Sequence, residues 1–405
     1  MNCLICGTPL ETFLDLGRMP IANGFLDAEE FTNEYFFNLR AGFCARCKMV
    51  QLTEQVDRER MFHDQYAFFS STSRHMEKHF QKIARTVQGQ VKDKADPFVV
   101  ELGSNDGIML RHLAVEGIRH LGIEPSTNVA TVARERGVNT VSRFFDENLA
   151  AEIVEQHGPA DLVLGFNVMC HIHDLHSVIR GIKILLKQDG LLIFEDPYLG
   201  DIVEKVSYDQ IYDEHAFYFC LLSVRNLFAD HAMQVVDVQP QSVHGGSMRY
   251  VIGHQDAVPV AEHVADRLEK ERIQGLDRME TFDAFRINVE QSRDRLLRQL
   301  RGMKKERQTV VGYAATSKST TVTNYCGITP ELVEFISDTT PIKQGKYSPG
   351  AHIPVRPYEE FRAKYPDVAL LFGWNHAPEI MANEQAFRDA GGKWLVYVPD
   401  VKVIP

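Results

Sequence analysis

The chain has 405 residues, enough for two or three domains that each bury a core. Its 44% hydrophobic and 24% charged residues are typical of a soluble globular protein, and no apolar run approaches the ~20 residues of a membrane span. The net charge of −11 argues against a protein that binds nucleic-acid backbones. Because MNCLICGTPL has neither the basic region nor the apolar stretch of a signal peptide, we expect a cytoplasmic protein.

Four of the seven cysteines form two CxxC pairs near the amino terminus, Cys3 with Cys6 and Cys44 with Cys47. One such turn presents two thiolates to an ion, and two turns complete a tetrahedral four-cysteine site that suits structural zinc. We therefore expect a zinc-binding domain over residues 1–70, folded largely by the metal. The alternatives are unliganded thiols or a redox pair, although no βαβ pattern surrounds these cysteines.

The charge of this first segment bears on its partners. Residues 1–70 contain six Lys/Arg and ten Asp/Glu, a net of −4, which is the wrong sign for a nucleic-acid module. We expect the zinc to shape the domain and to present the following DQYAFFSSTS to a neighbouring domain.

The stretch PFVVELGSNDGIMLRHL predicts a buried strand, a glycine-rich turn and a helix. Gly103 and Gly107 let the backbone approach a ligand, and the next strand ends at Glu124, where a carboxylate can accept both hydroxyls of a ribose. GSNDG lacks the central glycine of GxGxxG, so we expect a ligand without a pyrophosphate. The turn resembles the first motif of class I S-adenosylmethionine-dependent methyltransferases, with an NAD-binding domain as the alternative. The predicted cofactor-binding residues are Glu101, Gly103, Asn105, Asp106, Gly107, Glu124 and Asn167.

Further strands are predicted in ADLVLGFNVMCHIHDLHSVI, GLLIFEDPYL, MQVVDVQP and SMRYVIGH. The last two resemble the antiparallel hairpin that ends a methyltransferase sheet, so we expect this domain to cover residues 71–255. His171 follows a strand and is expected at the carboxyl edge where α/β folds bind ligands. We expect His173 and His176 to face solvent.

Residues 256–300 are charged with recurrent apolar positions, which predicts bridging amphipathic helices. Residues 301–405 then predict a second, Rossmann-like α/β domain. Its first turn, GYAATSKSTT, could bind phosphate through Ser317, Lys318 and Ser319, although the spacing is not that of a P-loop and an ordinary αβ turn is the alternative.

Four features in this order resemble the family of sugar C-methyltransferases: the paired cysteines, GSNDG, YDEH and the GYAATSKSTT domain. The resemblance covers essentially the whole chain. It implies a zinc domain, a central S-adenosylmethionine domain and a Rossmann-like last domain, with a nucleotide-linked 4-keto-6-deoxy sugar between the last two. It places five polar residues around the sugar: Tyr66, His171, Tyr212, Glu214 and His215. One departure is YAFFSS, where the family has Tyr-Pro-Tyr-His-Ser-Ser, so Phe68 and Phe69 replace a tyrosine and a histidine.

Methylation of carbon requires a base beside an acidic C–H and donors around the neighbouring ketone. His215 suits the base because an unperturbed histidine has a pKa near ~6.5. Glu214 could orient His215 or share the proton, and Tyr212 or Tyr66 could donate to the enolate oxygen. The alternative for this cluster is a helix start with Glu214 interacting with the dipole. SVHGGSMR adds three candidates for contact with the sugar or its phosphates: His244, Ser247 and Arg249.

Two other functions compete with this interpretation. An NAD-dependent sugar-nucleotide oxidoreductase or epimerase is disfavoured because neither turn reads GxGxxG and no Tyr-xxx-Lys pair occurs. A non-catalytic zinc scaffold or nucleic-acid binder is disfavoured by the acidic charge. The sequence leaves open the nucleotide, dTDP or GDP, and the oligomeric state, a monomer included.

Overall fold

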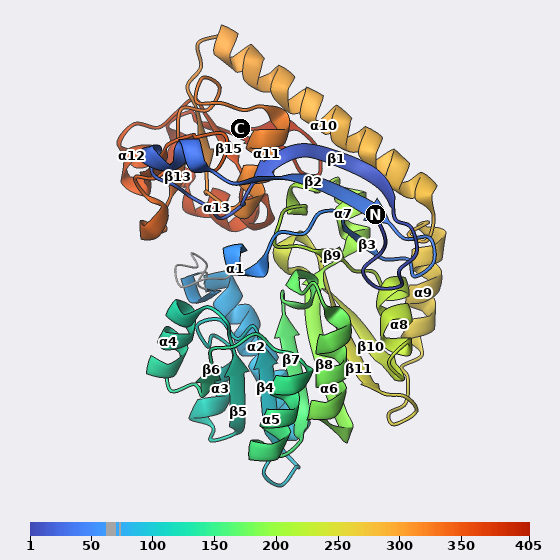
Figure 1. Cartoon of the computed structure of the whole chain (residues 1–405). Helices are drawn as coiled ribbons and strands as arrows, with labels where there is room; N and C mark the ends of the chain where they lie inside the picture. The colour runs from blue at the N-terminus through green and yellow to red at the C-terminus, as the bar shows by residue number, and fades with distance from the viewer. Residues whose placement is uncertain (62–69, 73) are drawn as a thin grey trace.

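The computed structural model describes residues 1–61, 70–72 and 74–405, and for residues 72, 74 and 75 only the backbone. The described residues form three sheets of four, seven and six strands. Figure 1 shows the seven-stranded sheet and its helices as one body, the C-terminal sheet as a second body, and the long strands β1 and β2 running between them. Among the described residues, no helix is long and apolar enough to cross a bilayer.

The four-stranded sheet belongs mainly to the amino-terminal cysteine domain. β1 pairs antiparallel with β2, β2 with β3, and β3 with β9, whose residues come from the middle of the chain. The first domain is therefore joined to the segment directly after the YDEH motif. The elements of this sheet and the short helix after it are β1 (Glu11–Pro20), β2 (Phe36–Phe43), β3 (Val50–Leu52), β9 (Phe217–Tyr218) and α1 (Arg58–Met61).

The seven-stranded sheet has the order β10-β11-β8-β7-β4-β5-β6. Its central strands are parallel and nearly all apolar, as expected for strands covered on both faces. β11 runs antiparallel to β8 and β10, which confirms the predicted terminal hairpin. The strands are β4 (Phe98–Leu102), β5 (Arg119–Ile123), β6 (Thr140–Val141), β7 (Ala160–Phe166), β8 (Leu186–Pro197), β10 (Met233–Gln241) and β11 (Ser247–His254).

Helices cover this sheet and connect its parallel strands in the manner of a class I methyltransferase domain, as the sequence predicts. They are α2 (Arg74–Val91), α3 (Leu110–Val115), α4 (Thr127–Glu135), α5 (Glu147–His157), α6 (Leu175–Leu185), α7 (Leu199–Lys205) and α8 (Leu221–Ala229).

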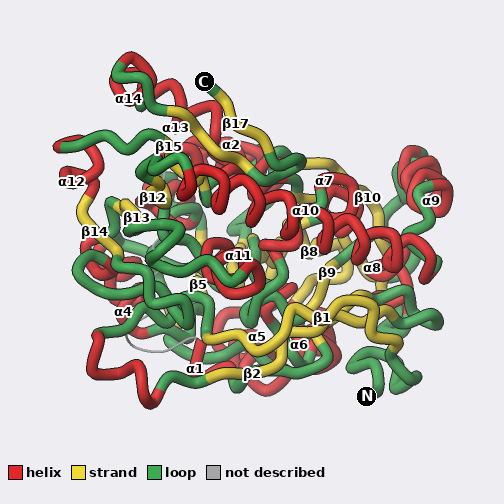
Figure 2. The backbone as a smooth tube through the Cα atoms, turned by 90° about the horizontal axis from the view of Figure 1, so that it is seen from above, coloured by secondary structure: helices red, strands yellow, loops and turns green. Residues whose placement is uncertain are grey.

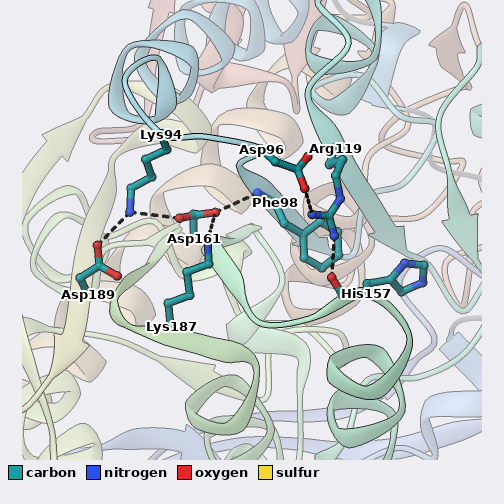
Figure 3. Close-up of polar contacts among 8 residues, drawn as sticks. All are labelled: Lys94, Asp96, Phe98, Arg119, His157, Asp161, Lys187 and Asp189. Carbon is teal, nitrogen blue, oxygen red and sulfur yellow. Dashed lines mark hydrogen bonds and ion pairs between the residues drawn. The ribbon is translucent and has the colours of Figure 1, made fainter.

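Asp161, at the start of β7, ties together the edge of this sheet where the parallel strands begin (Figure 3). Its side chain is 1% exposed and accepts a hydrogen bond from the Phe98 amide at 2.9 Å. Lys94 lies 3.0 Å and Lys187 2.8 Å from its two carboxylate oxygens. The strand ends on the opposite edge are thus left to form the functional site.

Two helices lead to the last domain, α9 (His263–Ile273) and α10 (Met279–Lys305). Figures 1 and 2 show α10 running along the outside of the molecule from α8 and α9 to the C-terminal sheet. Its buried residues recur every three, four or seven positions, including Phe282, Phe285, Val289 and Leu296, which confirms the predicted amphipathic helix.

The C-terminal sheet has the order β14-β13-β12-β15-β16-β17, with β17 alone antiparallel among its described pairs, and is Rossmann-like as predicted. The predicted boundaries at residues 70, 255 and 300 stay predictions. The strands are β12 (Val310–Tyr313), β13 (Ile336–Asp338), β14 (Val355–Pro357), β15 (Val368–Leu371), β16 (Lys393–Val396) and β17 (Lys402–Ile404). The helices are α11 (Ser317–Cys326), α12 (Tyr358–Ala363), α13 (Ala377–Asn383) and α14 (Gln385–Asp389).

Candidate active site

A cavity of ≈ 590 Å³ lies at the carboxyl ends of the parallel strands of the middle sheet. Each of four strands contributes a wall residue near its carboxyl end: Gly103 from β4, Glu124 from β5, Asn167 from β7 and Glu195 from β8. Parallel strands bring these positions to one edge of the sheet, which is where α/β folds bind ligands.

The glycine-rich turn after β4 brings backbone rather than side chain to the cavity. Gly103 has a φ of +60°, and a Cβ there would lie 2.0 Å from Cγ2 of Val168. Two backbone amides hold Glu124: that of Asn105 in this turn donates to its Oε2 at 3.0 Å, and that of Ser126, after β5, donates to its Oε1 at 2.8 Å. Burial raises the pKa of Glu124, and these amides partly offset that effect. Each carboxylate oxygen keeps a lone pair that can accept a ribose hydroxyl.

Asn167 supplies an unsatisfied polar atom on the opposite wall. Its backbone has a φ of +56°, and its backbone amide donates to the Glu195 carbonyl at 2.6 Å. Its Oδ1 is buried and makes no hydrogen bond to any described residue. Buried polar atoms are almost always paired, so Oδ1 is positioned for a donor on a bound molecule. The close backbone, the strand-end carboxylate and this oxygen fit S-adenosylmethionine, whose nucleoside and amino-acid parts carry hydroxyl and ammonium donors.

A buried charge network forms the inner wall of the cavity. Glu195, 4% exposed at the side chain, lies 2.8 Å from Nε2 of His79 and accepts two hydrogen bonds from Arg249 at 2.8 and 3.1 Å. Burial alone would raise the pKa of Glu195, but His79 and Arg249 outweigh it and the net shift is downward. The ionised carboxylate of Glu195 therefore faces the cavity, and its contacts with His79 and Arg249 join β8 to α2 and β11.

The YDEH motif forms a turn next to this wall. The His215 amide donates to the Tyr212 carbonyl at 3.0 Å, which closes the turn around Asp213 and Glu214. The His215 ring stacks on His171 at 5.2 Å between centroids, and His171 lines the cavity. The motif thus lies behind the cavity wall, buried, rather than at the start of a surface helix.

Hydrogen bonds fix the tautomer of His215. Its Nδ1 lies 2.8 Å from the Gln210 carbonyl, which can only accept, so Nδ1 carries the hydrogen. Nε2 lies 2.8 Å from the Tyr212 hydroxyl and therefore accepts from it. Burial, followed by the charge of His171, lowers the pKa of His215 well below its ordinary value. His215 is accordingly neutral near pH 7 and holds a lone pair on Nε2.

The four amino-terminal cysteines converge as the sequence predicts. All four sulfur atoms lie within 4.8 Å of one another, with Cys3 to Cys47 at 3.6 Å and Cys6 to Cys44 at 3.4 Å. Thiolates bound ~2.3 Å from a tetrahedral zinc ion lie roughly 3.8 Å apart, so the cluster fits that ion. The site is closed by protein ligands, which indicates a structural role.

Comparisons with known proteins agree with this architecture. Three family models match in chain order: "Putative zinc binding domain" at residues 3–62, "Methyltransferase domain" at 73–238 and "C-methyltransferase C-terminal domain" at 242–399. The C-methyltransferase NovU of Streptomyces niveus is 35% identical over 412 residues, covering 100% of this chain and 96% of that protein. The chain belongs to the C-methyltransferase family.

Two further matches involve part of the chain. A ubiquinone biosynthesis O-methyltransferase of Glaesserella parasuis serovar 5 (strain SH0165) is 28% identical over 100 residues, which is 23% of this chain and 42% of that protein. The solved structure of magnesium protoporphyrin IX methyltransferase from Synechocystis PCC 6803 with bound SAH covers 44% of this chain and 85% of its own, at 17% identity and a TM-score of 0.35.

This C-methyltransferase therefore uses S-adenosylmethionine and carries a zinc domain, which confirms both predicted cofactors. The family assignment decides against the NAD-dependent alternative. Of the predicted site residues, six line the cavity: Gly103, Asn105, Glu124, Asn167, His171 and His244. Tyr66, Phe68 and Phe69 lie outside the described residues.

Three of the predicted cofactor-binding residues instead support the glycine-rich turn. Glu101 is buried beneath it, where burial and then the charges of Asp106 and Glu124 raise its pKa well above the ordinary value. Asp106 is fully buried and pairs with Arg136 at 3.0 Å and with the Ser71 hydroxyl. Gly107 has a φ of +75° and packs on Val138. These residues shape the loop but do not line the cavity among the described residues.

Several predicted substrate-binding residues also have structural contacts. The Ser247 hydroxyl donates to the Val243 carbonyl. Arg249 donates to Glu195 and does not itself line the described cavity. Ser319 is fully buried in the first turn of α11, where its hydroxyl donates to the Thr316 carbonyl. Ser317 and Lys318 lie in the same turn, away from the described cavity wall.

Lys318 nevertheless acts through its charge on His244, a residue of the cavity wall. Burial lowers the pKa of Lys318, and Asp209 partly offsets this. Burial, and next the charge of Lys318, lowers the pKa of His244 to about 3. The C-terminal domain therefore adds positive potential beside the cavity.

Two histidines expected to face solvent do not. His173 lines the cavity beside α1. His176 bonds the His231 ring at 2.7 Å and the Ile5 carbonyl at 2.8 Å, which fastens α6 to the first CxxC turn. Sequence reasoning also missed His79 and Glu195. Glu195 is an acid within the strand predicted in GLLIFEDPYL, close to the carboxyl end of β8, a signal that could have found it. His79 lies within a helix and carries no such signal.

Proposed function

We propose that this C-methyltransferase methylates C3 of a nucleotide-linked 4-keto-6-deoxy sugar, with His215 as the base and Glu214 as its supporting carboxylate. The observation that carries the proposal is the neutral His215, whose Nε2 lone pair faces Tyr212. A methyl group can be added to carbon only after that carbon loses a proton, and a neighbouring ketone makes the C–H acidic enough for a histidine. The ordered motifs that resemble the sugar C-methyltransferases support the sugar as substrate.

The residues of the turn account for the proton and for the charge on oxygen. The Tyr212 hydroxyl first turns from Nε2 to the ketone oxygen, which exposes the one lone pair of Nε2. His215 then takes the C3 proton on that lone pair, and the electron pair of the C–H bond moves to the ketone oxygen. In that position the Tyr212 hydroxyl donates to the developing enolate oxygen, which is where stabilisation has the largest effect on rate.

The other groups of the site hold the two reactants. Gly103, Glu124 and Asn167 would hold S-adenosylmethionine, which supplies an electrophilic methyl group when bound. The positive potential of Lys318 and the Rossmann-like sheet suit the nucleotide diphosphate, either dTDP or GDP.

The test is incubation with methyl-labelled S-adenosylmethionine and a panel of dTDP- and GDP-linked 4-keto-6-deoxy sugars. We expect label on C3 of one of them; label on oxygen or nitrogen would refute C-methylation. His215→Ala should lower turnover by roughly 10²–10⁴-fold, the usual contribution of a general base, while the affinity for S-adenosylhomocysteine changes little. Full turnover by that variant would remove His215 from the base role.

A further inference from the structure

A short segment of the zinc domain, residues 21–26, reaches the junction of all three domains. It follows β1 and includes Ala22, which is 2% exposed. The Thr320 hydroxyl of the C-terminal domain donates to the Ala22 carbonyl at 2.8 Å. A few residues on, Leu26 pairs with Tyr347 as an isolated bridge. The segment is thus held from the C-terminal side, and its other side faces the YDEH turn.

Both central residues of the YDEH turn are bound by this segment. The Ala22 amide donates to Oδ1 of Asp213 at 2.9 Å, and Nδ2 of Asn23 donates to Oε1 of Glu214 at 2.6 Å. These contacts join residues 191 positions apart in the chain. Because Asp213 and Glu214 are the middle of the turn, holding them also fixes its ends, Tyr212 and His215.

The two carboxyl groups cannot both be charged so close together in a buried site. Asp213 is 1% and Glu214 4% exposed. Burial, and next the charge of Glu214, raises the pKa of Asp213 to about 8. The Asn23 amide donates to Glu214, and Lys343 from the C-terminal domain interacts with it electrostatically. The negative charge of the pair is therefore favoured on Glu214, the carboxylate next to His215.

We infer that Asn23 is a positioning residue for the methyl-transfer reaction, through which the zinc domain orients Glu214 and the Tyr212–His215 pair. The inference rests on the proposed function, since it acts through the residues assigned there to proton transfer. It also gives the zinc domain a part in turnover: the metal folds the domain that carries Asn23 to the turn.

The chain offers a matched control for this residue. Asn38, in the same domain, donates from Nδ2 to Oε2 of Glu54 at 2.8 Å, and this pair is also partly buried. Asn38→Ala therefore removes the same kind of hydrogen bond from the same domain, away from the YDEH turn. Comparing Asn23→Ala with Asn38→Ala separates a catalytic effect from a general loss of an Asn–Glu contact.

The experiment uses the full zinc-loaded chain and the sugar nucleotide that the labelling panel identifies. Proton abstraction is followed directly as solvent-deuterium incorporation at C3 with S-adenosylhomocysteine in place of the methyl donor, alongside kcat, KM and their pH dependence. For Asn23→Ala we expect exchange and kcat to fall roughly 10- to 100-fold, the value of a hydrogen bond to a charged group, with KM within about threefold of wild type.

The pH profile adds a readout that a structural role would not change. Removing a donor from a carboxylate disfavours its charged form and raises its pKa, so the acid limb of kcat should move to higher pH in Asn23→Ala. Asp213, Lys343 and Cys170 also interact electrostatically with Glu214 and are unchanged in the variant. Asn38→Ala should keep the wild-type profile, exchange rate and kcat.

Two results would overturn the inference. One is an Asn23→Ala variant whose exchange and pH profile match those of Asn38→Ala. The other is a loss of activity that merely parallels a fall in thermal stability and in S-adenosylhomocysteine affinity. A wild-type chain that neither exchanges C3 hydrogen nor methylates any sugar of the panel would refute the proposed function itself, and the inference with it.

Discussion

Asp161→Asn should destabilise the middle domain, and its neighbour Asp189 provides the comparison. Both carboxylates bind Lys94 at nearly the same distance, 3.0 Å for Asp161 and 2.9 Å for Asp189 (Figure 3). Their burial differs sharply: the side chain of Asp161 is 1% exposed and that of Asp189 70%. Asp161 additionally binds Lys187 and the Phe98 amide. Comparing the two variants therefore tests whether the distance to Lys94, or burial together with the additional partners, decides how much a carboxylate stabilises the domain.

The magnitude follows from burial. Removing one partner of a fully buried ion pair costs ~3–5 kcal/mol, but Lys94 and Lys187 are 33% and 34% exposed and can regain water. We therefore expect Asp161→Asn to lose about 2–3 kcal/mol, and Asp189→Asn about 0–1 kcal/mol as for a surface pair. In a domain of this size these values correspond to roughly 4–12 °C and under roughly 4 °C in Tm.

The assay is differential scanning calorimetry. The transition to follow is the one whose Tm rises when S-adenosylhomocysteine is added, because that transition is the unfolding of the cofactor-binding domain. Acid should abolish the difference from wild type. The lysines and the Phe98 amide outweigh burial and lower the pKa of Asp161 below 3.8. Its stabilisation is therefore complete above that unfolded-state value and is lost as the pH falls through the folded-state pKa. Equal Tm shifts for the two variants at pH 7 would refute the reasoning.

Two further predictions concern the cofactors. Gly103→Ala should reduce the affinity for S-adenosylhomocysteine, measured by calorimetry, more than tenfold. The new Cβ would lie 2.0 Å from Cγ2 of Val168, and the positive φ itself costs ~1–2 kcal/mol for a residue with a Cβ. Gly89→Ala is the control and should bind normally, because nothing lies within 4 Å of its new Cβ. Cys44→Ser should abolish stoichiometric zinc in the purified protein and lower kcat, because the first domain loses its metal. Cys220→Ser lies outside the cluster and should retain about one zinc per chain. A normal zinc content in Cys44→Ser would contradict the four-cysteine site.

The sequence could predict those parts of the site whose residues lie within a few positions of one another in the chain. Two residues between cysteines, a pair of glycines after a strand and an acid at the next strand end each specify a geometry within a few positions. Cys3, Cys44, Gly103 and Glu124 were found in this way, and the structure brings them to the places expected. The folds of the two α/β units followed from the same alternation of strands, turns and helices.

Contacts between distant segments carry no such signal. His79 and Glu195 are 116 positions apart, and Asn23 lies 191 positions before Glu214. Asp106 belongs to a recognisable motif, but the motif does not show that Arg136 and Ser71 bind one oxygen of its carboxylate. A motif fixes the backbone path, whereas the partner that reaches each side chain depends on how whole domains pack.

Burial of the YDEH turn also sets which of its side chains are charged before the proposed proton transfer. Near pH 7 His215 is neutral because burial lowers its pKa, and Asp213 is largely protonated because burial and Glu214 raise its pKa to about 8. In the proposed reaction, the imidazolium that forms when His215 accepts the C3 proton lies one residue from the charge favoured on Glu214. That attraction is strong between buried groups and is absent before the proton moves. By this proposal Glu214 acts on the transition state rather than on the bound substrate, and Glu214→Gln should lower kcat far more than it raises KM.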